Sequence, residues 1–81
     1  MSALITLYTS PGCHLCEQAR DTLLRVRADH FFDLLECDIT RDDDLHRVYL
    51  ERIPVIALDG EELFDYFVDE EVLRTRLASL H

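Results

Sequence analysis

Two cysteines, Cys13 and Cys16, lie three residues apart, directly after the turn-forming stretch Ser10-Pro11-Gly12. From Cys13 onward, apolar residues recur at three- and four-residue steps, which predicts a helix from about Cys13 to Asp29. A C-x-x-C pair at the start of a helix can bind a metal, form a structural disulfide or exchange disulfides with a substrate. The rest of the sequence discriminates between these three roles.

A metal centre within one chain is not expected. Zinc and iron–sulfur sites need about four soft ligands, and the chain has three cysteines, of which Cys37 falls in another predicted element. His14 is adjacent to Cys13, but neighbouring residues of a helix do not share a face. A cluster shared between two chains is the alternative, although we expect a monomer.

A purely structural disulfide between Cys13 and Cys16 is also disfavoured. So short a loop would constrain the unfolded chain very little, and the cytosol tends to reduce such bonds. Reversible exchange remains, and a C-x-x-C that follows a strand and opens a helix is the usual setting for it.

The two sulfurs are predicted to play different parts. Cys13 falls at the helix N-terminus, where unpaired N–H groups and the helix dipole favour an anion. We therefore expect the pKa of its thiol to lie below the value of about 8.5 for a free cysteine, which makes it the nucleophile. Cys16 lies on the apolar face of the helix, so we expect it to be the buried, resolving thiol. His14 is either a cation that stabilises the Cys13 thiolate or a solvated, neutral side chain, and Cys37 is expected to be an inert apolar filler.

The elements that must position this pair follow one another in the order β-α-β-α-β-β-α. The expected strands are Ala3–Tyr8, Phe31–Cys37, Ile53–Leu58 and Glu62–Val68. After the helix at the cysteines, a second helix is expected behind a T-x-x-D capping box at Thr40, and a third behind Asp69. The residues expected on the apolar faces of these two helices are Leu45, Val48, Tyr49, Leu73, Leu77 and Leu80.

The hairpin signal Asp59-Gly60 makes the last two strands antiparallel. The prediction is therefore one α/β domain over residues 1–81, with a four-stranded mixed sheet and helices on both faces. Tyr66 and Phe67 fall before the last helix, where packing into the core is the larger expectation.

The net charge of −9, from 17 acidic and 8 basic residues, argues against binding to nucleic acid or to anionic membranes. The acidic residues are spread along the chain, so we read them as keeping a small protein in solution rather than as selecting a cationic partner. No apolar run is long enough to span a bilayer. The start lacks the basic region of a signal peptide, so a cytoplasmic location is expected.

Two stretches, LYTSPGCHLCEQA after the first strand and RIPVIALDGEEL after the second helix, resemble the thioredoxin superfamily. Within it, the chain is similar to short bacterial glutaredoxin-like proteins that carry C-H-L-C-E or C-H-L-C-D. The resemblance covers essentially the whole chain. It implies a cis peptide bond before Pro54, which would face the cysteines, and a backbone at Ile53 that pairs with an incoming extended peptide.

Several residues depart from typical glutaredoxins. Ser10 replaces a lysine or arginine, Arg52-Ile53-Pro54 replaces Thr-Val-Pro, and Phe67-Val68 followed by three acidic residues replaces a Gly-Gly pair. We therefore expect weak glutathione binding, with Arg52 as the one basic residue placed to recover part of it.

The sequence thus predicts a dithiol–disulfide oxidoreductase that acts on protein or small-molecule disulfides, with no metal and no required cofactor. The alternative is a non-catalytic binding module or redox-responsive adaptor that keeps the fold without useful turnover. Because both Cys13 and Cys16 are present, the oxidoreductase is favoured.

Overall fold

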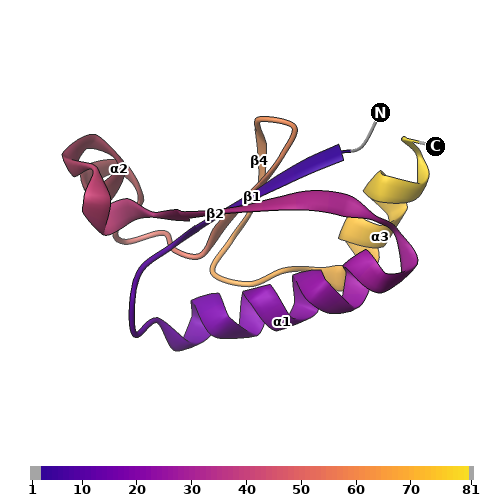
Figure 1. Ribbon diagram of the computed structural model, residues 1–81, viewed down its shortest axis with the longest axis horizontal. Coiled ribbons are helices and arrows are strands. Elements are labelled where there is room, and N and C mark those ends of the chain that lie inside the picture. Colours follow the sequence, from indigo (N-terminus) through magenta and orange to yellow (C-terminus); the bar gives the residue numbers. More distant parts are fainter. Residues whose placement is uncertain (1–2, 81) are drawn as a thin grey trace.

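The fold is a four-stranded mixed sheet with three helices (Figure 1), as the sequence predicted. The computed structural model describes residues 3–80, and within that range no helix has the length and apolar character needed to cross a membrane. The elements are β1 (Ala3–Thr9), α1 (His14–Asp29), β2 (Phe32–Asp38), a 3₁₀ turn (Ile39–Arg41), α2 (Asp43–Tyr49), β3 (Val55–Leu58), β4 (Glu61–Asp65) and α3 (Glu70–Ala78). The strand order is β2-β1-β3-β4, in which only β1 and β2 run parallel.

One face of the sheet carries the main core. Residues of β1 alternate in burial, and Ile5 and Leu7 have no exposed surface because they face α1 and α3. Both helices lie on this side of the sheet (Figure 1). Their apolar faces supply the rest of the core, namely Ala19, Leu23 and Val26 from α1 and Leu73 and Leu77 from α3. The packing of α1 on the sheet therefore fixes where its N-terminus, and hence Cys13, must lie.

The other face is covered only at one end, by α2, which lies away from α1 and α3 (Figure 1). The ring of Tyr49 stacks on that of Tyr8, with the ring centroids 4.4 Å apart. Leu4 and Leu35 remain 40% and 49% exposed elsewhere on this face. Helices thus occupy both faces, but α2 has no fully buried residue, and the prediction that Val48 packs inward is wrong, since it is 55% exposed.

The turn Asp59-Gly60 joins β3 and β4 as predicted, and both residues have positive φ. Asp59 also extends the pairing of β1 with β3 beyond Leu58, because its N–H donates to the Leu4 carbonyl and its carboxylate accepts the Leu4 N–H.

Several boundaries differ from the prediction. Strand β3 begins at Val55 instead of Ile53, after the buried Pro54, and β2 runs from Phe32 to Asp38 instead of from Phe31 to Cys37. The cap of α2 is Asp42 instead of Thr40, because the Thr40 N–H and hydroxyl both donate to the Asp38 carboxylate. Strand β4 ends at Asp65 instead of Val68, because the next residue, Tyr66, turns the chain with a φ of 70°. Leu80 is 52% exposed because α3 ends two residues before it.

Candidate functional site

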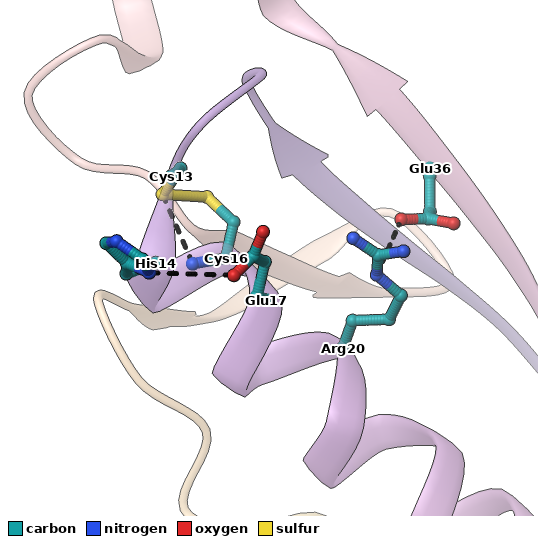
Figure 2. The surroundings of a disulfide bond; sticks show 6 residues. All are labelled: Cys13, His14, Cys16, Glu17, Arg20 and Glu36. Carbon is teal, nitrogen blue, oxygen red and sulfur yellow. Dashed lines mark hydrogen bonds and ion pairs between the residues drawn. A yellow bond between two sulfur atoms is a disulfide. The ribbon is translucent and has the colours of Figure 1, made fainter.

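Cys13 and Cys16 form a disulfide at the start of α1 (Figure 2). Cys13 is the N-cap residue, with extended backbone, and its Sγ accepts a hydrogen bond from the Cys16 N–H at 3.1 Å. Gly12, with a φ of 76°, lets the chain turn from β1 into this position. Cys13 is partly exposed whereas Cys16 is only 2% exposed. The two sulfurs thus differ in access in the direction that the sequence predicted.

His14 points away from the disulfide into solvent (Figure 2). Its side chain is 92% exposed, and its Nδ1 lies 3.6 Å from a Glu17 carboxylate oxygen. Of the two alternatives for His14, the structure therefore shows the solvated side chain. Cys37 is a partly buried free thiol on β2, across from Tyr8 of β1. Among residues 3–80, no three His, Cys, Asp or Glu side chains are grouped so as to hold a metal ion.

Pro54 directly precedes β3, at the end of the sheet from which the chain leads into Cys13. Val55 pairs with Tyr8, so Pro54 is next to the end of β1 from which the chain turns into Cys13. The Ile53–Pro54 peptide bond is cis, as predicted, and the Pro54 ring is buried. The Ile53 N–H donates to the Tyr49 carbonyl at 3.0 Å. The amide of Ile53 is therefore used within the chain, which leaves its carbonyl oxygen as the group that can accept from a peptide.

Arg52 is not a free cation. Its guanidinium bonds the Asp65 carboxylate at 3.1 and 3.2 Å and Glu62 at 2.6 Å, and it lies over the Tyr49 ring. The hydrogen bond from Arg52, followed by that from Tyr49, holds the pKa of Glu62 below its ordinary value. The Tyr49 hydroxyl donates to the same Glu62, which raises the pKa of Tyr49 to about 12. The charge of Arg52 is thus neutralised by two carboxylates of the same chain, and no local sequence pattern indicated these partners.

A shallow hollow of about 100 Å³ lies between α1 and the loop before α3. Its lining residues are Leu15, Gln18, Ala19, Thr22, Tyr66, Phe67 and Val68. Leu15, which stands between the two cysteines in sequence, is 45% exposed, Tyr66 is 49% exposed and Phe67 is 67% exposed. The expectation that Tyr66 and Phe67 pack mainly into the core is therefore wrong. They form an apolar surface beside the cysteine pair.

The start of α3 follows directly after Val68, the last residue in sequence that lines this hollow. Asp69 caps the helix as predicted, and its carboxylate accepts the Val72 N–H at 3.1 Å. Glu70 is bonded by Arg25 and Arg74, and these hydrogen bonds hold its pKa below the ordinary value. Of the three acidic residues expected to oppose an anionic ligand here, Glu70 is thus already neutralised by two cations.

In the reduced protein, we expect iodoacetamide to modify Cys13 much faster than Cys16 at neutral pH. Cys13 is partly exposed and its sulfur accepts the Cys16 N–H, which stabilises the thiolate, whereas Cys16 is buried. The rate of Cys13 modification should rise with pH as the thiolate forms. It should reach its plateau at a lower pH than the modification rate of a free cysteine does. Mass spectrometry of timed digests separates these two sites from Cys37. Faster labelling of Cys16 than of Cys13 would reverse the assignment of their roles.

Comparison with known proteins adds family information to this geometry. Residues 4–78 match the model of the family described as "Glutaredoxin-like domain (DUF836)". An uncharacterised protein of Mycobacterium tuberculosis is 30% identical over 79 residues, which cover 91% of this chain and 81% of that protein.

Solved structures with a similar fold include bacterial proteins and thioredoxins. Protein Ne2328 of Nitrosomonas europaea has a TM-score of 0.82 at 29% identity, covering 94% of this chain and 92% of its own. A structural-genomics target from X. campestris has a TM-score of 0.76 at 36% identity, covering 93% and 96%. Thioredoxin from Halobacterium salinarum, at 18% identity and a TM-score of 0.68 over 96% of this chain and 74% of its own, shares the fold alone.

Proposed function

This chain belongs to the glutaredoxin-like domain family, and we propose that it is a thiol–disulfide oxidoreductase working through a reversible Cys13–Cys16 disulfide. The observation that carries the proposal is the asymmetry of the pair. A partly exposed sulfur caps the N-terminus of α1 and is bonded to a buried sulfur one turn further on.

The reaction follows from this asymmetry. In the reduced protein the Cys13 thiolate attacks one sulfur of a substrate disulfide, forms a mixed disulfide and releases the other substrate sulfur as a thiolate. Cys16, after loss of its proton to solvent, attacks the Cys13 Sγ, which releases the second substrate thiolate and closes the Cys13–Cys16 bond. The substrate gains two electrons and the protein loses two. A dithiol reductant restores the protein by the same steps in reverse.

The surroundings of Cys13 favour the thiolate that starts this sequence. The N–H groups of the first turn of α1 point toward it, and the Cys16 N–H donates to its sulfur at 3.1 Å. The Cys13 sulfur is also the leaving group when a thiol of the reductant displaces it from a mixed disulfide, so a stabilised thiolate favours that step of the return reaction as well.

We further propose that the preferred substrates are protein disulfides rather than glutathione disulfide. No cation stands at Ser10, and the guanidinium of Arg52 is neutralised by Glu62 and Asp65. The carboxylate of Asp69 occupies the N-terminus of α3, the kind of place where an anionic ligand could bind. A tripeptide with two carboxylates therefore finds little to hold it, whereas an apolar side chain fits against Phe67 and Leu15.

Reduction of insulin disulfides driven by dithiothreitol should be clearly catalysed, whereas reduction driven by glutathione should need glutathione above about 1 mM to approach saturation. A cation at position 10 or a free Arg52 would form charge-assisted hydrogen bonds to the carboxylates of glutathione. Each such bond is worth roughly 1.5–3 kcal/mol, so its absence lowers the affinity for glutathione more than tenfold. Both rates can be followed in parallel by turbidity and by thiol titration. The Ser10→Lys variant restores a cation beside the cysteines and should lower the glutathione KM several-fold.

Saturation by sub-millimolar glutathione in the unmodified protein would refute the preference for protein disulfides while keeping the oxidoreductase. Absence of turnover with either reductant, in a protein whose Cys13–Cys16 disulfide still forms and reduces, would instead favour the redox-responsive adaptor.

A further inference from the structure

Tyr66 has a backbone conformation that side-chain-bearing residues rarely adopt. Its φ is 70°, and the Phe67 N–H donates to the Asp65 carbonyl at 2.8 Å, which makes Tyr66 the central residue of a γ-turn. This form of γ-turn, with positive φ at its centre, is rare and strained. Such strain persists only where surrounding contacts hold it, and it is concentrated at functional sites.

The turn lets Tyr66 bond both ends of the segment that carries the cis-proline. Its N–H donates to the Pro54 carbonyl at 2.8 Å, and its hydroxyl donates to the Glu51 carbonyl at 2.6 Å. With a residue in the ordinary extended conformation, strand β4 would continue past this point and its side chain would follow the alternation of the strand. Tyr66 thus bonds both the first and the last residue of the segment Glu51–Pro54.

The residue before Tyr66 adds a third connection. Asp65 bonds the guanidinium of Arg52, in the middle of the same segment, at 3.1 and 3.2 Å. The segment 51–54 belongs to no helix or strand, and it is held from two sides: the amides of Arg52 and Ile53 donate to the Tyr49 carbonyl, and the end of β4 supplies the bonds from Asp65 and Tyr66. The Ile53 N–H is bonded directly to Tyr49, and the bonds from Tyr66 fix the residues on either side of Ile53, at Glu51 and Pro54.

On the basis of the proposed function, we propose that Tyr66 is a positioning residue that holds the Ile53 backbone where a peptide substrate can pair with it beside Cys13. A fixed Ile53 backbone raises the affinity for substrates that form hydrogen bonds through their own main chain. It gives no advantage to a small disulfide without a peptide backbone. Tyr66 therefore sets the selectivity for protein disulfides without touching the reacting sulfurs.

The test is the Tyr66→Phe variant, which removes the hydroxyl bond to Glu51 and keeps the ring and the turn. We expect the KM for insulin disulfides, with dithiothreitol as reductant, to rise about three- to tenfold, the effect of one net hydrogen bond. The kcat for insulin and the rate of reduction of Ellman's reagent, which has no peptide backbone, should stay unchanged. The matched control is Thr75→Val, which removes a hydroxyl-to-carbonyl bond of the same kind in α3 and should change none of these rates.

A second readout needs no turnover. Amide hydrogen exchange of Arg52 and Ile53 should become faster in Tyr66→Phe and not in Thr75→Val, because both amides lie in the segment that the hydroxyl holds. Unchanged exchange, or faster exchange with an unchanged insulin KM, overturns the positioning role. An equal loss of activity toward insulin and Ellman's reagent also overturns it. If the unmodified protein itself reduces neither substrate, faster exchange in Tyr66→Phe still supports the placement of the segment by Tyr66, while the oxidoreductase is refuted.

Discussion

Replacing Cys13 with serine will reduce disulfide turnover to the uncatalysed background. A serine hydroxyl does not ionise at neutral pH, so no nucleophile remains at the exposed N-terminus of α1. Cys16 cannot take over, because it is 2% exposed and lies inside the first turn. Insulin reduction by dithiothreitol, corrected for the rate without protein, measures the loss.

The Cys16→Ser variant should fail at a later step. Cys13 can still attack, so a mixed disulfide with a thiol-bearing peptide accumulates and is visible by mass spectrometry of the intact protein. Cys37→Ser is the matched control, since Cys37 is a partly buried thiol outside the disulfide, and it should retain full turnover. Full activity of Cys13→Ser, or a mixed disulfide on Cys37 in place of Cys13, would contradict the mechanism.

Replacing Leu23 with alanine will lower the free energy of unfolding by about 2–5 kcal/mol, the usual cost of emptying a fully buried leucine site. Leu23 has no exposed surface and lies in the core between α1 and the sheet. A chain of this size has a total stability of only roughly 4–12 kcal/mol, so the variant will be partly unfolded at mild urea concentrations. Urea titration followed by circular dichroism, with both proteins in the disulfide form, measures the change.

The adjacent residue supplies the control. Leu24 is 46% exposed on the same helix, so Leu24→Ala should change the stability by no more than about 0.5–1 kcal/mol. Because helix propensity changes in the same way in both variants, the difference between them isolates the burial of Leu23 against the sheet. Equal losses in the two variants would mean that the orientation of α1 described above is incorrect.

Features set by neighbouring residues were readable from the sequence. The order of elements, the turn at Asp59-Gly60 and the cap at Asp69 all follow from local preferences for φ, side-chain oxygens and apolar spacing. Cys13 and Cys16 belong to the same class, because the period of α1 alone puts the first at the helix end and the second on the buried face. The cis bond before Pro54 came from family resemblance, not from local preference.

Local signals were insufficient where two choices were nearly equal. Thr40 and Asp42 are both good N-caps, and the choice of Asp42 was made by Asp38, which binds the Thr40 hydroxyl and N–H. The inward face of α2 was likewise predicted from spacing, but Val48 is exposed, whereas Tyr49 stacks on Tyr8 and bonds Glu62 of the sheet. A helix of two turns has little to decide its orientation except the partner that it meets.

The chemistry around the cysteine pair was decided by contacts between residues distant in sequence. Arg52 looked like a free cation for a substrate, yet β4 places Glu62 and Asp65 against it. Tyr66 looked like a core residue at the end of a strand, yet it turns back to bond Glu51 and Pro54. Charges and hydrogen bonds depend on distances of a few ångströms across the sheet. Sequence spacing fixes such distances within a helix or hairpin, and only the packed fold fixes them between one element and another.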